Sequence, residues 1–187
     1  MITLSEMKKK ALGLIEELNP KSELLTDDPD IATKMNDVVN QVMFELVRLK
    51  KLPGYVEIPV NKGDLITFDL IEKASKYEVY QLGIVRGVPV DYKAQGTIIK
   101  VLEDGIAEID FFKYPERITS KTKDSYEFEL TNDVLEIMPY GIAADLLKSD
   151  ISTEYGSIYA ARYAEMKQLL DPRYMMGSIY IEGGVDV

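Results

Sequence analysis

Carboxylates are the side chains of this sequence best suited to chemistry, and one group of them surrounds a proline. Asp27, Asp28 and Asp30 could supply oxygen ligands to Ca²⁺ or Mg²⁺. They also flank Pro29, which suits the first position of a helix, where Asp is a preferred capping residue. No stretch matches the EF-hand loop. We therefore interpret these aspartates as helix caps and predict neither a metal site nor a cofactor.

A second set of carboxylates falls on stretches that resemble β-strands. A glycosidase would need two such groups facing each other at a defined separation. Alternation with apolar residues predicts that most of them face water instead. A carboxylate-based hydrolase is thus a weak alternative, for which the candidates are Glu57, Asp69, Glu108, Asp110, Glu127 and Glu129.

Other catalytic arrangements lack their residues. The chain contains no histidine and no cysteine, which excludes Ser-His-Asp and Cys-His arrangements and the zinc sites built on these side chains. There is no GxGxxG sequence, Walker loop or nucleophile elbow. We predict that the protein is not an enzyme.

Tyrosines offer a different kind of site, because the chain has twelve of them and no tryptophan. Tyr77, Tyr80 and Tyr92 could form a platform on which a sugar stacks, as in carbohydrate-binding sandwiches. Packing in the core or across strands is the favoured interpretation. A carbohydrate-binding or receptor-contact module is therefore the alternative function, carried by the strand-rich region.

The apolar residues near the C-terminal end are candidates for protein contact. Tyrosine is common at interfaces, although the 155, 159, 163 stripe also suits packing between helices. The tail beyond Asp171-Pro172 is apolar, and an exposed apolar tail is a liability. It either folds back on its own domain or docks on another subunit as an added strand. The candidate interface residues are Tyr155, Tyr159, Met175, Met176, Ile179, Tyr180 and Ile181.

Composition limits the class of protein. The chain has 187 residues, 46% of them hydrophobic, which is enough to bury a core. No apolar run is long enough to span a bilayer, and the N-terminus lacks the apolar stretch of a secretion signal. A net charge of -10 disfavours nucleic-acid binding through phosphate contacts. We expect no membrane association and no specific nucleic-acid binding.

Helices are predicted at both ends of the chain. Residues 3–18 and a segment beginning at Pro29 and stopped by Pro53-Gly54 carry apolar residues at spacings of three and four. Thr3 or Ser5 can cap the first helix. A third helix is expected at 134–148, with Pro139 kinking it or marking its true start. A fourth begins after Asp150 or Ser152-Thr153 and ends at residue 170.

Six strands are predicted between these helices, at residues 56–60, 64–70, 77–85, 96–102, 105–112 and 125–131. Asp104-Gly105 predicts a hairpin between the fourth and fifth strands. The connections at 86–95 and 113–124 are expected to be exposed.

The expected fold class is α+β. N- and C-terminal helices, each apolar on one face, form a helical bundle that carries an inserted antiparallel β-sandwich or barrel-like module. The predicted domains are residues 1–53 with 132–172 for the discontinuous bundle, 54–131 for the all-β module and 173–187 for the tail.

The chain resembles the head-to-tail connector proteins of tailed bacteriophages, also called adaptor or head-completion proteins. The similarity is carried by FFKYPE at 111–116 with IT at 118–119, by LEIMPYGIAADLL at 135–147 and by YAARYAEM at 159–166. The two N-terminal helices also fit the helical N-terminal part of that family. These motifs consist of packing residues and not of catalytic ones. The most specific similarity lies in the C-terminal half of the chain.

The resemblance implies a structural virion protein, made in the cytoplasm of the host bacterium and located in the virion neck. It implies a ring, typically dodecameric, that docks under the portal protein, contacts tail or neck proteins and lets DNA pass during packaging and ejection. It also implies that the C-terminal tail docks on the portal or on a neighbouring subunit. A negatively charged inner surface of this ring would limit adhesion of the DNA.

Overall fold

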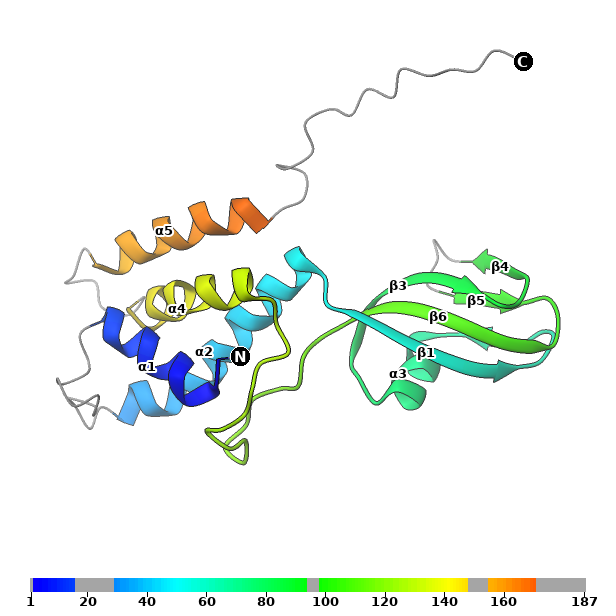
Figure 1. Cartoon of the computed structure of the whole chain (residues 1–187), viewed down its shortest axis with the longest axis horizontal. Helices are drawn as coiled ribbons and strands as arrows, with labels where there is room; N and C mark the ends of the chain where they lie inside the picture. The colour runs from blue at the N-terminus through cyan, green and yellow to red at the C-terminus, as the bar shows by residue number, and fades with distance from the viewer. Residues whose placement is uncertain (1, 16–28, 94–97, 148–154, 171–187) are drawn as a thin grey trace, which may run out of the picture.

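Helices and strands occupy opposite ends of an elongated molecule (Figure 1). The computed structural model describes residues 2–15, 29–93, 98–147 and 155–170. Four of its helices lie together at one end: α1 (Leu4–Leu14), α2 (Pro29–Lys50), α4 (Asn132–Leu146) and α5 (Tyr155–Leu170). The remaining helix, α3 (Phe68–Ser75), lies with the strands. The fold is thus mixed α and β, as predicted.

Helix α1 begins where the sequence predicts. The Thr3 hydroxyl accepts a hydrogen bond from the Glu6 N–H at 3.2 Å, and the Glu6 carboxylate accepts one from the Thr3 N–H at 2.9 Å. This reciprocal capping box satisfies two amides that the first turn leaves free, and its hydrogen bonds lower the pKa of Glu6. The cap turns Leu4 and Met7 into the core, where both are fully buried. The helix ends at Leu14, with Ile15 as its C-cap, which is earlier than the predicted end at residue 18.

Helix α2 begins at Pro29, as predicted, whereas Asp27 and Asp28 lie outside the described residues. Its predicted apolar stripe is largely buried. The helix stops at Lys50 rather than at Pro53-Gly54, because Lys51 adopts a left-handed conformation with φ of 57°. The Lys51 N–H donates to the Val47 carbonyl at 2.7 Å, and the first strand begins two residues later.

Helix α4 is the centre of the helical end, since it contacts α1, α2 and α5. It starts at Asn132 and continues through Pro139, so the prediction that this proline marks the true start is wrong. Close packing is possible because Gly141 has no side chain where α2, α4 and α5 meet. The shared core includes Leu4, Met7, Val39, Val42, Met43, Leu46, Leu135, Met138, Ile142, Tyr163 and Leu170.

Residues 114–131 run along the helical end and contribute to its core through Ile118 and Phe128. The strand predicted at 125–131 is not part of a sheet, so this prediction is wrong. Its only ladder contact in the described residues is an isolated bridge between Thr3 and Glu127. The alternation in the sequence nevertheless matches the burial of the side chains. Tyr126 and Phe128 face the helical core, whereas Glu127 faces solvent. The predicted domain boundaries stay a prediction.

The strands form two antiparallel sheets of three strands each, and within the described residues neither sheet closes into a barrel. One sheet has the order β1-β6-β3, with β1 (Pro53–Val60), β6 (Gly105–Lys113) and β3 (Val79–Arg86). The other has the order β2-β5-β4, with β2 (Leu65–Ile66), β5 (Ile98–Val101) and β4 (Val90–Lys93). Both sheets and α3 share a second core, which includes Ile58, Ile66, Ile71, Ile99, Ile109 and Phe111.

Three local predictions in the strand region are wrong. Asp104-Gly105 does not form a hairpin, because β5 and β6 belong to different sheets. The strand predicted at 64–70 ends after Ile66, and Thr67 caps α3 by accepting a hydrogen bond from the Leu70 N–H. The connection predicted at 86–95 contains β4. For the hairpin and for β4, pairing between strands decides the outcome, and short sequence windows do not contain that information. The end of β2 is instead set locally, by the Thr67 cap.

Candidate functional site

Within the part of the chain that the structure describes, one face of the sheet β1-β6-β3 is uncovered, and large apolar side chains lie on it. Tyr55, Ile84 and Ile106 are each more than half exposed, at 51, 59 and 56%. Residues of β6 alternate strictly, with Ala107, Ile109 and Phe111 buried on the opposite face. We call the uncovered surface the outer sheet face and define it by Tyr55, Glu57, Ile84, Arg86, Ile106, Glu108 and Asp110.

The outer sheet face also gathers three of the carboxylates singled out in the sequence. Glu57 and Glu108 lie directly opposite each other on β1 and β6. Arg86 donates toward Asp110 at 2.8 Å and lies 3.9 Å from Glu108. The hydrogen bond that the Tyr55 hydroxyl donates to Glu57 is the main cause that raises the pKa of Tyr55 to about 12. Three carboxylates against one guanidinium leave this face negative.

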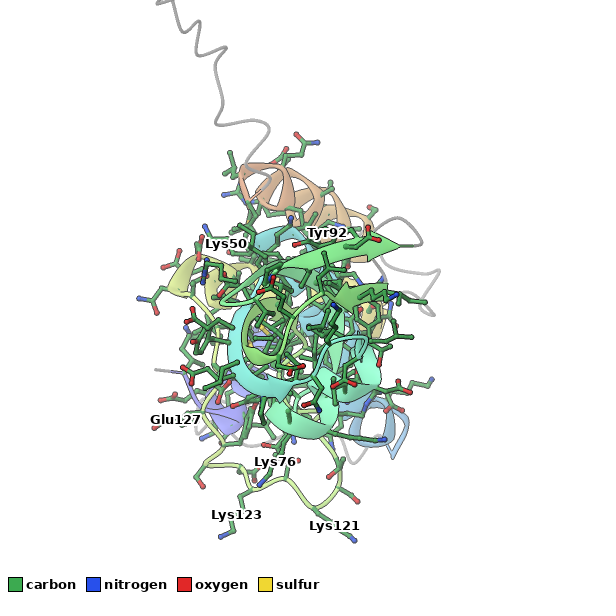
Figure 2. All side chains as sticks on the ribbon, turned by 90° about the vertical axis from the view of Figure 1, so that its right-hand side faces the viewer. Lys50, Lys76, Tyr92, Lys121, Lys123 and Glu127 are labelled. Carbon is green, nitrogen blue, oxygen red and sulfur yellow. The ribbon has the colours of Figure 1, made fainter. Side chains whose placement is uncertain are left out.

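The remaining candidate carboxylates are not brought to that face. Asp69 lies on α3, Glu127 is exposed near α1 (Figure 2), and Glu129 pairs with the buried Lys113 at 3.1 Å. Among the described residues, no group of three acidic side chains is placed to hold a metal ion. The candidate hydrolase residues therefore do not form one site.

The three tyrosines considered for sugar binding are separated. Tyr80 is partly buried against Tyr114, with ring centroids 4.8 Å apart, and its hydroxyl donates to the Val47 carbonyl at 3.1 Å. The Lys113 ammonium lies 3.3 Å from the centre of the Tyr77 ring. Tyr92 is exposed on β4, in the other sheet (Figure 2). Packing, the favoured interpretation, accounts for Tyr80, whereas Tyr77 and Tyr92 are exposed.

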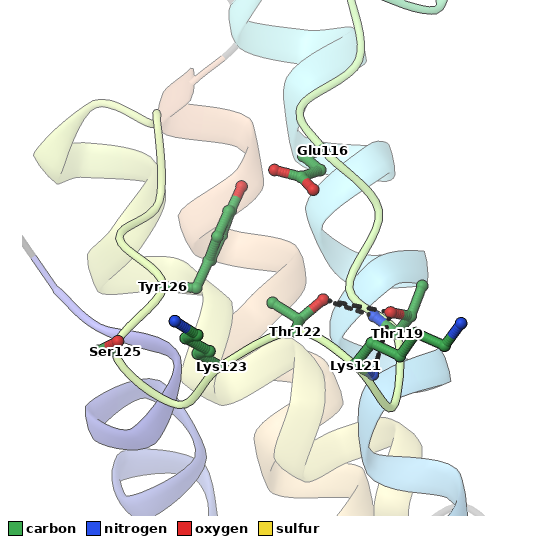
Figure 3. A pocket seen from close by; sticks show the side chains of 7 residues that line it. All are labelled: Glu116, Thr119, Lys121, Thr122, Lys123, Ser125 and Tyr126. Atoms are coloured by element: carbon green, nitrogen blue, oxygen red, sulfur yellow. Dashed lines mark hydrogen bonds between the residues drawn. The ribbon is translucent and has the colours of Figure 1, made fainter.

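A shallow polar hollow of about 360 Å³ lies in the loop between β6 and α4 (Figure 3). The Thr119 N–H donates to the Thr122 hydroxyl at 2.9 Å and holds the turn. The Tyr126 ring points toward Glu116 across the hollow. Burial first, and then the charge of Glu116, raise the pKa of Tyr126 to about 12. Lys121 and Lys123 extend from this loop into solvent (Figure 2).

An apolar groove of about 270 Å³ lies where the helical end meets the first strand. Its walls come from the end of α2, the link to β1, and the start of α4. Two lysines, Lys50 and Lys51, stand at its rim. Sequence reasoning missed this groove because its walls come from segments far apart in the chain. The lining residues are Val47, Lys50, Lys51, Leu52, Pro53, Leu130, Thr131 and Val134.

One lysine of this groove forms an ion pair. Lys50 lies 2.6 Å from Asp133 at the start of α4. Partial burial acts to raise the pKa of Asp133. The hydrogen bonds from Lys50, Thr131 and the Val134 N–H, together with the charge of Lys50, outweigh it and leave this pKa below its ordinary value. A carboxyl group whose pKa is lowered on folding stabilises the fold above its unfolded pKa, and this contribution is lost as the pH falls.

We therefore expect Asp133→Asn to lower stability at about pH 6 and to have a smaller effect near pH 3, as the pH falls below the ordinary pKa of the carboxyl group. Urea midpoints at both pH values measure the difference from the unmodified protein. Glu136→Gln, an exposed change on the same helix, is the control. A deficit in Asp133→Asn that stays constant between the two pH values would contradict the role given to this pair.

The tyrosine stripe of α5 is used within the chain where its side chains are described. The Tyr163 hydroxyl donates to Glu45 at 2.8 Å, and burial together with this carboxylate raises the pKa of Tyr163. The Tyr159 hydroxyl donates to the Leu14 carbonyl. At Tyr155 only the backbone is described. The other candidate interface residues, Met175, Met176, Ile179, Tyr180 and Ile181, lie outside the described residues.

No protein-family model matches the chain, and no curated protein matches its sequence significantly. Of the helices that the structure describes, none combines the length and the apolar character needed to cross a bilayer.

Proposed function

We propose that this chain is a structural, non-enzymatic virion protein of a tailed bacteriophage that joins the portal to the tail. In this proposal a helical bundle of N- and C-terminal helices carries the inserted β-module. Copies of the chain form a ring in the virion neck, bind the portal and tail or neck proteins, and leave a channel through which DNA passes.

The observation that carries the proposal is the outer sheet face. Tyr55, Ile84 and Ile106 are exposed on it and are not part of the core that the two sheets share. Exposed apolar side chains on one uncovered sheet are typical of a surface that another polypeptide covers. A ring needs two different complementary patches on each subunit. The negative outer sheet face can serve as one of them, opposite an apolar and basic patch on the neighbour.

The residues of the family resemblance support the same proposal. The motif at 135–147 lies on α4 and its C-terminal end, and the motif at 159–166 lies on α5. These helices meet where Tyr163 covers Gly141, so the two motifs encode one packing unit. Nothing comparable favours carbohydrate binding, because Tyr77, Tyr80 and Tyr92 form no common platform.

Native mass spectrometry of the protein mixed with the portal protein of the same genome tests the proposal. We expect a complex that contains several copies of this chain for each portal ring. Ile106→Lys on the outer sheet face should weaken assembly at least about tenfold, because a desolvated cation in a contact costs more than about 1.4 kcal/mol. Leu65→Lys, at an exposed position of β2, is the matched control. A protein that stays monomeric and ignores the portal contradicts the proposal.

A further inference from the structure

The groove between α2, α4 and the link to β1 is apolar and lacks an occupant among the described residues. Val47, Leu52 and Val134 supply apolar walls, and Lys50 and Lys51 stand at the rim. Its volume, about 270 Å³, falls just below the range of roughly 300–1,000 Å³ that holds small-molecule ligands. It is a suitable size for a few side chains of a docked segment.

Helix α5 ends at the same end of the helical layer as this groove, and the contacts between the helices give its direction. Gly141 of α4 faces both Tyr163 of α5 and Val42 of α2, and Lys50 pairs with Asp133. Helix α4 therefore runs antiparallel to α2, and the short link from α4 to α5 makes these two antiparallel as well (Figure 1).

This register places the end of α5 beside the groove. Seven residues beyond Tyr163, Leu170 reaches the level of Val134, which lies seven residues before Gly141 and lines the groove. Leu170 and Val134 belong to the same buried cluster. Figure 1 shows the end of α5, the end of α2 and the start of α4 at the same end of the helical layer.

From this geometry we propose that the chain's own tail occupies the groove, through the apolar segment 175–181. Eight extended residues after Leu170 reach about 26 Å, whereas packed helices lie only about 8–10 Å apart. The segment 175–181 therefore reaches the groove easily. Glu182 directly follows it in the sequence, so docking brings a negative charge toward Lys51, since Lys50 is already paired with Asp133.

The tail of the same chain is favoured over the tail of a second copy. A short tether keeps a segment at an effective concentration in the millimolar range, far above the micromolar concentration of a second copy in solution. Addition of the tail as a strand to β1 is disfavoured, because Pro53 and Pro59 remove two N–H groups from that edge. Side-chain docking in the groove needs none of these groups.

A disulfide between engineered cysteines tests the proposal cleanly, because the chain has no cysteine of its own. Thr131 lines the groove, is exposed and makes no side-chain cap bond in α4. Its hydrogen bond to Asp133 lies at the surface, so Thr131→Cys should fold normally. It is combined with Ile179→Cys in the full chain. The control combines Ile179→Cys with Glu136→Cys, an exposed position of the same helix outside the groove. The two positions on α4 are only about 7.5 Å apart along the helix.

Oxidation should link 131 to 179 within one chain about tenfold faster than 136 to 179, measured by gel mobility. The rate should be the same when the protein concentration is raised tenfold. Equal rates for the two pairs would overturn the proposal, because an undocked tail samples both positions. Links between chains that increase with concentration would overturn it in favour of the tail of a second copy. The test uses the protein alone, so it does not depend on the proposed function.

Discussion

Replacing Asn40 with leucine should lower the free energy of unfolding by about 3 kcal/mol. The Asn40 side chain is buried on α2, where its amide donates to the Ile118 carbonyl and its oxygen accepts from the Ile118 N–H, both at 2.8 Å. Leucine has a similar size but cannot form either bond. It would leave a buried N–H and a buried carbonyl unpaired, at about 1–3 kcal/mol each, and part of this cost is offset by apolar burial. Urea unfolding measures the change.

Asn36, one turn earlier on the same helix, is the matched control. Its side-chain oxygen is buried without a hydrogen-bond partner among the described residues. Asn36→Leu removes an unsatisfied polar atom and should be neutral or slightly stabilising. Equal losses in the two variants would show that the bonds to Ile118 do not anchor the loop to α2.

Replacing Gly141 with leucine is expected to cost about 3 kcal/mol. Even a single carbon added there would lie 2.8 Å from the Tyr163 ring and 2.9 Å from a methyl group of Val42. Neither neighbour can withdraw easily, since Tyr163 is held by Glu45 and Val42 is buried in α2. We expect α5 to separate from α4, which hydrogen exchange of the α5 amides would detect along with lower stability.

The control for this variant is Ala161→Leu, which enlarges an exposed position of α5. It should change stability by less than about 0.5 kcal/mol. Gly141→Ala should lie between the two, because the gain in helix propensity of about 1 kcal/mol offsets part of the clash. Unchanged α5 protection in Gly141→Leu would contradict the three-helix contact at this residue.

Helices were the most predictable part of this fold, because their signals are local. The capping pair of Thr3 and Glu6 and the proline at position 29 lie within one turn of the helix starts they define. Helix α3 also has such a signal in Thr67, followed by Leu70 and Ile71 at helical spacing, but the β-rich residues before it obscured it. Local signals cannot predict the left-handed Lys51, which ends α2 in place of a glycine.

Strand pairing was less predictable, because it depends on partners far away in the sequence. Residues 126–130 alternate like a strand, yet their buried side chains face helices, since alternation reports burial on one side and not the identity of the neighbour. Asp104-Gly105 has the composition of a hairpin turn, but the strands on either side of it pair in different sheets.

The candidate surfaces were predictable only in part. The sequence indicated that tyrosines and the tail matter for contacts with other proteins, and both stay predictions. It did not indicate the outer sheet face, since Ile84 and Ile106 are ordinary strand residues until the sheet shows which face is covered. Nor could it indicate the groove, whose lining residues Val47, Leu52 and Val134 meet only in the folded chain.

Electron microscopy of the protein mixed with the purified portal of the same genome tests the central claim most directly. The account predicts a ring of additional density on the portal axis, with an open channel wide enough for duplex DNA. Portal particles that look the same with and without this protein, at concentrations well above those used for assembly, would contradict it.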